Sequence, residues 1–286
     1  MSWFFLSLVH ALLLSVVWLS FKKSQDRGFS GESVLFLYSI VLVAGVLVWS
    51  LFRGEPLVFP PLFWTMLLFI AGGAAGLSNL LLLYSFKQGP NPGLSLALAD
   101  TKVLWMTLIG FFFLGSALSF GTLSGVLAVL LGVWLMYVGS RVIGFGWGLL
   151  ALFASLAATA YWVFIKLSQA ALLDLDILAV LILVFLPQII VIYIFRRNKL
   201  QFPEIFKQPT FLILAVTGLV GALSNFVSIK AVLAAPNPGY PLAVSAASII
   251  VTLAASWVFF GDRPNRRQAL AALIIFLAIV TIRLTS

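Results

Sequence analysis

The chain of 286 residues contains no cysteine and only one histidine, His10. Disulfides, thiol chemistry and cysteine metal sites are therefore excluded. The sequence also lacks the His-Glu-x-x-His, Gly-x-Ser-x-Gly and phosphate-loop motifs that mark common zinc, serine and ATP-dependent enzymes. We therefore expect no enzyme, no catalytic residue, no metal and no cofactor.

Charged residues are scarce as well. They make up 9% of the chain, whereas apolar residues make up 63% and the mean hydropathy is +1.17. Too little polar surface remains to cover a soluble globule, so the solvent must be lipid. Apolar runs of roughly 20 residues, long enough to cross about 30 Å of hydrocarbon, cover residues 3–21, 33–52, 62–86, 94–114, 118–138, 146–167, 177–195, 211–234, 240–260 and 268–284. We predict an all-α membrane protein with ten transmembrane helices.

The two halves of the chain repeat one another. The tetrapeptide Pro-Asn-Pro-Gly occurs at residues 90–93 and again at 236–239, an offset of 146 residues (236 minus 90). The same offset aligns Ser78-Asn79 with Ser224-Asn225, and an offset of 144 (162 minus 18) aligns Trp18 with Trp162. Self-similarity of this kind in so apolar a chain is typical of membrane transporters built from repeats.

Each half, 1–141 and 142–286, contains five predicted spans, and an odd number turns the second copy upside down in the membrane. The fold prediction is therefore two inverted five-helix repeats. The basic residues of the loops agree with this inversion. Arg53, Lys166, Lys230 and Arg283 are the only ones on one side of the predicted bundle, and the other basic loop residues all fall on the opposite side. Because basic loops favour the cytoplasm, we expect both termini outside, in a bacterial or archaeal cytoplasmic membrane. The net charge of +9 thus reflects orientation and not nucleic-acid binding.

A short motif near the end of each half resembles a known family. The ninth span ends in Phe-Phe-Gly-Asp-Arg-Pro, residues 259–264, and the first half has Phe-Leu-Gly-Ser-Ala-Leu at 113–118, without the acidic residue. With ten spans in two halves, this pattern resembles the EamA-like members of the drug/metabolite transporter superfamily. The resemblance implies a central cavity lined by spans one, three, four, six, eight and nine, and it implies no particular substrate.

One acid lies close to the middle of a predicted span. Asp100 and Lys102 both fall inside the fourth run, where an ionisable group costs roughly 2.5–3.5 kcal/mol and therefore faces a cavity or a partner. Their counterparts in the second half are Ala246 and Ser248. On a helix Asp100 and Lys102 point roughly 200° apart, so they are not a natural pair. Asp100 could bind substrate or a proton, or form a structural ion pair; its possible partners are Lys102 by bending of the helix, Lys166, Lys230 and a cationic substrate.

Spans one and six share a polar and aromatic face, in which Ser15, Trp18, Lys22 and Gln25 recur as Thr159, Trp162, Lys166 and Gln169. Spacings of three and four residues place each set on one side of a helix. We expect Trp18 and Trp162, together with Tyr161 and Trp105, to bind substrate by stacking on a planar or cationic group. The alternative is that these tryptophans anchor the span ends and the lysines extend to the headgroups.

Asn79 and Asn225 occupy matching places in the two halves, and a buried amide must be hydrogen-bonded. They either bridge helices or line the cavity and bind substrate. His10, near the middle of span one, is either a packing residue or part of a proton or ion-pair relay with Asp100, Lys166 and Lys230.

Each Pro-Asn-Pro-Gly ends one helix and begins the next, because proline lacks a backbone donor and glycine tolerates positive φ. We expect tight hairpins at Pro90, Pro92 and Gly93 and at Pro236, Pro238 and Gly239. These hairpins are either plain turns or hinges that move during alternating access.

Together these features predict a secondary transporter that moves a small metabolite across the bilayer by alternating access. An amino acid or related metabolite exporter is preferred, because Asp100 and Lys102 could meet a zwitterion. A carrier for a quaternary or aromatic amine is the alternative, and a non-transporting membrane scaffold is a third reading that the polar groups inside the spans argue against. The expected partners are a small-molecule substrate and the lipid bilayer, and the protein is expected to be a monomer or a homodimer.

Overall fold

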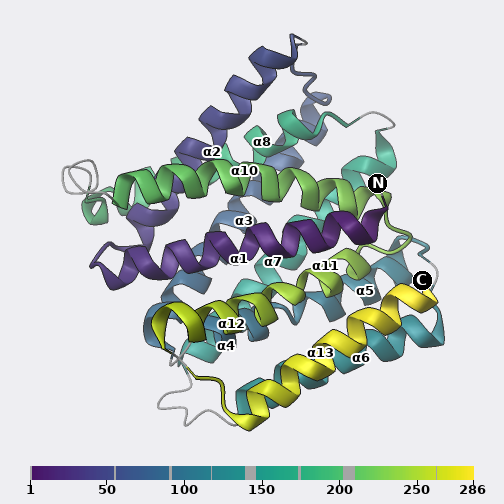
Figure 1. Cartoon of the computed structure of the whole chain (residues 1–286). Coiled ribbons are helices and arrows are strands. Elements are labelled where there is room, and N and C mark those ends of the chain that lie inside the picture. Colours follow the sequence, from purple (N-terminus) through teal and green to yellow (C-terminus); the bar gives the residue numbers. More distant parts are fainter. Residues whose placement is uncertain are drawn as a thin grey trace.

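A computed structural model of the chain describes residues 2–54, 56–89, 92–116, 118–138, 146–172, 175–201, 210–261 and 263–286. These residues form a bundle of helices without a strand (Figure 1). The elements, in chain order, are α1 (Trp3–Asp26), α2 (Gly31–Arg53), α3 (Leu62–Gln88), α4 (Pro92–Ala99), α5 (Lys102–Phe113), α6 (Phe120–Val138), α7 (Gly146–Ala171), α8 (Ile177–Arg196), the 3-10 helix η1 (Arg197–Lys199), α10 (Thr210–Ala234), α11 (Gly239–Ser245), α12 (Ala247–Phe260) and α13 (Arg266–Thr285).

In the described part of the chain, eight segments are long and apolar enough to cross a membrane, namely α1, α2, α3, α7, α8, α10, the joined α11 and α12, and α13. Helix α5 and the apolar part of α6, residues 120–135, are shorter. Large apolar side chains cover the outside of the bundle; Phe52 is 87% exposed and Phe120 is 88% exposed. Such a surface suits lipid and not water. The all-helical, multi-pass prediction is therefore confirmed.

The fourth and ninth predicted spans are not continuous helices, as residues 94–114 and 240–260 led us to expect. The fourth is divided into α4 and α5 at Asp100 and Thr101, and the ninth into α11 and α12 at Ala246. At both divisions the backbone forms a hydrogen bond between residues three apart, as in a 3-10 turn. These bonds run from Val103 N to Asp100 O and from Ile249 N to Ala246 O, and each is 3.0 Å long. These two bonds lie at equivalent positions of the sequence repeat.

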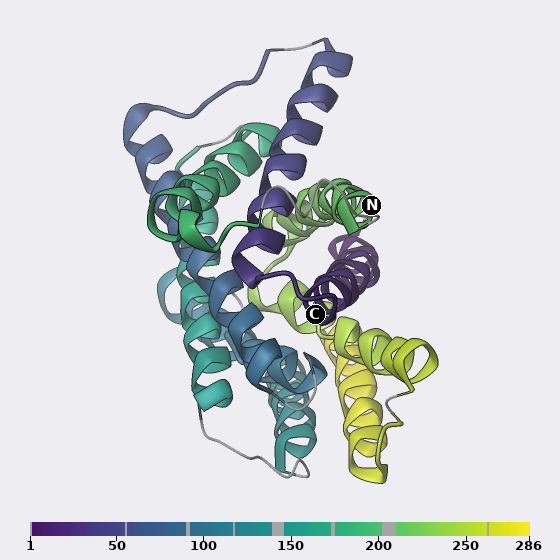
Figure 2. The same ribbon diagram turned by 90° about the vertical axis from the view of Figure 1, so that its left-hand side faces the viewer.

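Helices from the two halves pack as exchanged pairs. Helix α3 lies against α7 and α8, and its sequence counterpart α10 lies against α1 and α2. Helix α6 packs on its own counterpart α13, and α2 packs on α8. The pairs α1 with α10 and α6 with α13 are visible side by side in Figure 1. In the turned view of Figure 2, α2 rises between α8 and α10 and projects at the top of the bundle.

Small residues allow the closest of these contacts. A Cβ added at Gly72 of α3 would lie 2.8 Å from Cα of Val184 in α8. A Cβ added at Gly218 of α10 would lie 2.7 Å from Cβ of Val41 in α2. Both distances are too short for real atoms, so glycine is what permits the helices to approach.

Two ion pairs hold α2 and α8 together at opposite ends. Glu32, at the start of α2, lies 3.5 Å from Nζ of Lys199, which follows α8. Asp176, at the start of α8, lies 3.2 Å from Arg53 at the end of α2. Glu32 and Asp176 are 144 residues apart (176 minus 32), the same offset that aligns the sequence repeat. Acids at equivalent positions of the repeat thus form the ion pairs at the two ends of this helix pair. The sequence patterns did not identify them.

The start of α1 and the end of α13 lie at the same end of the bundle (Figure 1). The ring of Trp3 lies 6.3 Å from that of Tyr240, and Ser119 donates to the carbonyl of Thr285. The predicted boundary between the halves, at residues 141 and 142, lies outside the described residues, as does Pro90 of the first hairpin.

Candidate functional site

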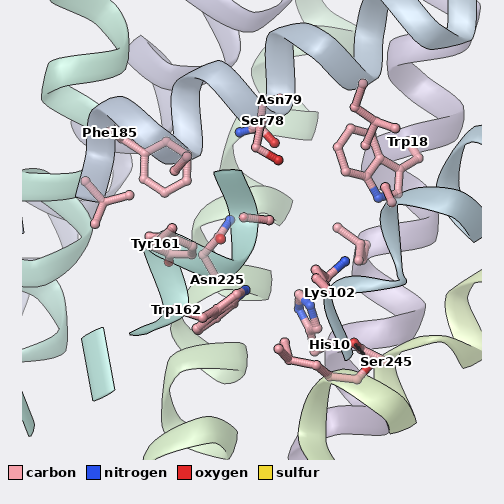
Figure 3. Close-up of a pocket in the computed structure, with 17 residues that line it drawn as sticks. His10, Trp18, Ser78, Asn79, Lys102, Tyr161, Trp162, Phe185, Asn225 and Ser245 are labelled. Atoms are coloured by element: carbon pink, nitrogen blue, oxygen red, sulfur yellow. Dashed lines mark hydrogen bonds between the residues drawn. The ribbon is translucent and has the colours of Figure 1, made fainter. Parts of the chain in front are cut away.

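A cavity lies between the halves at the centre of the bundle (Figure 3). Its volume is about 110 Å³, smaller than the roughly 300–1,000 Å³ of drug-sized ligand pockets. Seven residues that the sequence proposed for binding or relay line it: His10, Trp18, Asn79, Lys102, Tyr161, Trp162 and Asn225. Helices α1, α3, α5, α7, α10 and α11 contribute, as the family resemblance implied. Helix α8 also contributes, through Val184 and Phe185, and that contribution was not expected.

Asp100 and Lys102 form an ion pair with each other. Of the partners considered for Asp100, the structure thus shows Lys102, reached by a break in the helix; the separation of roughly 200° holds only for an unbroken helix. The tightened turn between α4 and α5 brings the two side chains to one side. Lys102 lines the cavity and its side chain is 17% exposed, whereas the Asp100 side chain is 7% exposed and is not among the lining residues. Thr101 donates to Oγ of Ser155 in α7 at 2.9 Å and so fixes this turn to the second half.

Two aromatic side chains in the cavity wall carry polar atoms without a hydrogen-bond partner. The indole nitrogen of Trp18 and the hydroxyl of Tyr161 are buried, and neither bonds to any described residue. The side chains are 8% and 6% exposed. Figure 3 shows the nitrogen-bearing edges of Trp18 and Trp162 turned toward the region of Lys102 and His10. Unpaired buried donors of this kind are uncommon in folded proteins and favour a ligand or water in the cavity.

His10 joins α1 to α10 at the cavity wall. Its Nδ1 lies 2.9 Å from Oγ of Ser224 and 3.0 Å from the Ser224 carbonyl oxygen. At the equivalent place in the other half, Ser78 of α3 donates to the carbonyl of Ala154 in α7 at 2.8 Å. Both halves thus use a serine at this contact, and only the first supplies a titratable side chain.

Both cavity asparagines bridge helices. Asn79 of α3 donates to Oε1 of Gln188 in α8 at 3.1 Å, and Gln188 in turn donates to Ser39 of α2. Asn225 of α10 donates to the hydroxyl of Tyr38 in α2 at 3.2 Å and to the carbonyl of Gly221 at 2.8 Å. Sequence reasoning missed Gln188, Ser39 and Tyr38, although a glutamine inside an apolar run is a signal that could have identified the first.

Three proposed site residues lie away from the cavity. Trp105 is 42% exposed and does not line it. Lys230 is exposed, and its ammonium lies 4.8 Å from the centre of the Phe226 ring. Lys166 donates to Gln169 at 2.9 Å and to the carbonyls of Val232 and Leu233 at the end of α10. Among the described residues neither lysine pairs with Asp100, whose partner is Lys102. A relay through Lys166 and Lys230 stays a prediction.

The second Pro-Asn-Pro-Gly is a buried turn between α10 and α11. Asn237 accepts a bond from the backbone nitrogen of Gly239 at 2.8 Å and donates to the carbonyl of Thr107 in α5 at 3.4 Å. Pro238 and Gly239 are buried, and Pro236 is exposed. In the first copy, α4 begins at Pro92 and includes Gly93. A hinge role for either turn stays a prediction.

Comparison with known proteins agrees with this architecture. One solved chain, described only as a crystal structure of a protein, superposes with a TM-score of 0.73 at 16% identity, covering 99% of this chain and 98% of that one. At that identity the likeness concerns the fold alone. None of the curated proteins compared matches the chain. Residues 145–284 match the model of the EamA-like transporter family. The second half of this multi-pass membrane protein is therefore an EamA-like transporter family domain.

Proposed function

We propose that the chain is a secondary transporter whose two inverted halves, 1–141 and 142–286, alternately open the central cavity to the two sides of the membrane. The observation that carries the proposal is the cavity itself, whose wall contains the charged Lys102 and two side chains, Trp18 and Tyr161, with buried unpaired donors. Polar groups are costly inside a bilayer, so their concentration in one internal space favours a binding site on a path. The exchanged packing of α3 with α7 and α10 with α1 supports an inverted arrangement.

The proposed cargo is a small metabolite, with an amino acid or related compound preferred and export as the direction. The Asp100 and Lys102 pair at the cavity wall supports this choice, because a zwitterion can exchange partners with an internal ion pair. The membrane is a bacterial or archaeal cytoplasmic membrane with both termini outside, and the protein acts as a monomer or a homodimer. Proteoliposomes loaded with unlabelled leucine should take up labelled leucine by exchange, and the absence of exchange with any amino acid would contradict this assignment.

A carrier for a quaternary or aromatic amine is the second candidate. The rings of Trp18, Tyr161 and Trp162 in the cavity wall favour it, since aromatic faces attract cations. The same exchange assay with labelled choline separates the two candidates, because an amine carrier takes up choline and ignores leucine.

Alternating access has its own test, which the cysteine-free sequence makes straightforward. Leu82 and Ser245 both line the cavity. The carbonyl of Leu83, next to Leu82, accepts a bond from Gln25 near the end of α1. Ser245 lies in the same short helix as Tyr240, whose ring packs near that of Trp3 at the start of α1. Single cysteines at these two sites should react with an impermeant maleimide from opposite sides of the membrane. Substrate should raise one reactivity and lower the other; reaction of both from one side under all conditions would refute the mechanism.

A further inference from the structure

We infer that the cavity binds the carboxylate end of a small organic acid, through the Lys102 ammonium and the unpaired donors of Trp18 and Tyr161. The inference rests on the transport function proposed above and names the chemical group that the site selects. It makes the carboxylate, and not a positively charged group, the main recognition element.

The unpaired polar atoms define what the ligand must offer. An indole N–H can only donate, so the Trp18 nitrogen requires an acceptor. The Tyr161 hydroxyl can donate to the same ligand. An ionised carboxylate is acceptor-only and presents two oxygens, so it can receive several donors at once. A quaternary ammonium offers neither a donor nor an acceptor and would leave the Trp18 and Tyr161 groups unpaired.

The charge of the cavity wall points the same way. Lys102 is the only lysine, arginine, aspartate or glutamate among the described residues that line the cavity. Asp100 pairs with Lys102 but does not itself line the space, so the positive end of the pair is the one at the cavity. An entering anion therefore meets an ammonium group first, whereas a cation meets that group as a like charge. The aromatic rings would have to overcome this repulsion to hold an amine.

The body of the ligand should be compact and apolar. Leu14, Leu82 and Phe185 line the cavity beside the polar groups, and its volume is about 110 Å³. Charge is confined to one side of this space, because the second-half counterparts of Asp100 and Lys102 are Ala246 and Ser248. A molecule with one charged end and a short hydrocarbon body matches this arrangement.

Isothermal titration of the full chain in lipid nanodiscs tests the inference with probes that share one skeleton. The probes are 4-methylpentanoate, 4-methylpentanamide, trimethyl(3-methylbutyl)ammonium and leucine. We expect 4-methylpentanoate to bind roughly tenfold or more tightly than the amide, because hydrogen bonds to charged groups are the stronger ones. The quaternary ammonium should bind more weakly still. Equal or tighter binding of the ammonium, or no binding of the acid, would overturn the inference.

Variants then assign the preference to the named groups. Lys102→Gln should abolish the preference for the acid over the amide, whereas Lys230→Gln, which removes an ammonium outside the cavity, should leave it intact. Trp18→Phe and Tyr161→Phe keep a ring while removing the donor, and each should weaken acid binding severalfold. If Lys102→Gln does not fold, the double variant Asp100→Asn with Lys102→Gln removes both charges together. A preference for the acid that survives in the neutral cavity would refute the assignment.

Flux measurements keep this inference separate from the proposed function. Uptake of the quaternary ammonium without uptake of the acid would refute a carboxylate site while leaving a transporter in place. Acid-selective titration without flux of any probe would uphold the site and refute transport.

Discussion

Nδ1 of His10 lies 2.9 Å from the hydroxyl oxygen of Ser224, which ties α1 to α10 beside the cavity. The corresponding contact in the other half, from Ser78 to the carbonyl of Ala154, needs no side chain from α7. Helix packing at this contact therefore does not require an imidazole. The first half nevertheless places one next to the proposed binding space.

The His10 contact leads to a first prediction, that its role is hydrogen bonding and not proton transfer. Asparagine at this position keeps a polar group near Nδ1 but cannot carry a proton at neutral pH. We expect His10→Asn to retain folding and most of the transport rate, with an unchanged response to pH, in proteoliposomes at pH 6 and pH 8. His10→Ala controls for loss of the contact with Ser224. A His10→Asn variant that folds normally yet loses the pH response would assign His10 to a proton relay.

A second prediction concerns the Asp100 and Lys102 pair. Removing one partner leaves a poorly solvated charge, which costs about 3–5 kcal/mol in buried pairs. Asp100→Asn and Lys102→Gln should each lower the thermal unfolding temperature in detergent. The double variant should be more stable than the sum of the single effects predicts, with a coupling on the order of 1 kcal/mol or more. Additive losses would mean that the two side chains do not interact.

The third prediction uses adjacent glycines in α3 as a matched pair. A Cβ at Gly72 would meet the backbone of Val184, whereas a Cβ at Gly73 meets nothing within 4 Å. Gly72→Ala should therefore destabilise the protein or push α3 away from α8. Gly73→Ala should be neutral or stabilise by up to about 1 kcal/mol, because alanine is the better helix former. Thermal unfolding of the two variants gives the comparison, and equal behaviour would refute the close approach of α3 to α8.

Gln188 provides a fourth prediction. It is 1% exposed and connects Asn79 to Ser39 across three helices. Gln188→Leu leaves the Asn79 amide without this partner and should cost about 1–3 kcal/mol. Replacing Asn79 by leucine as well should recover part of the loss, because two apolar partners need no bond. A Gln188→Leu protein as stable as the parent would show that water or another group satisfies Asn79.

Much of this architecture could be predicted from the pattern of apolar runs and from the internal repeat. Long runs such as 3–21 and 146–167 became α1 and α7, because twenty apolar residues have few stable alternatives to a helix in lipid. The divisions at Asp100 and Ala246 could not be predicted, since neither position contains proline or glycine. They depend on contacts with other helices, such as the bond from Thr101 to Ser155.

The proposed site residues also divide into those that a repeated helical pattern identifies and those that depend on tertiary contacts. Trp18 and Trp162 were identified by their repeated helical face, and both line the cavity. Trp105 carries no such repetition and is exposed outside the cavity. The sequence left the partner of Asp100 open between Lys102, Lys166, Lys230 and a substrate, because helical angles hold only while the helix is regular. Sequence periodicity thus locates a face, whereas the partner of a side chain depends on tertiary geometry.

The equivalent bonds at Val103 and Ile249 set a limit on how far the halves have diverged. The backbone interruption is the same in both, yet the residues around it have changed from Asp100 and Lys102 to Ala246 and Ser248. If an ancestral gene was duplicated, the bend belonged to the ancestor and the charges were acquired or lost in one copy afterwards. A synthetic chain built from two second halves would then keep both bends, and its cavity would lack the Asp100 and Lys102 charges. A chain built from two first halves would place two copies of Lys102 in the same cavity.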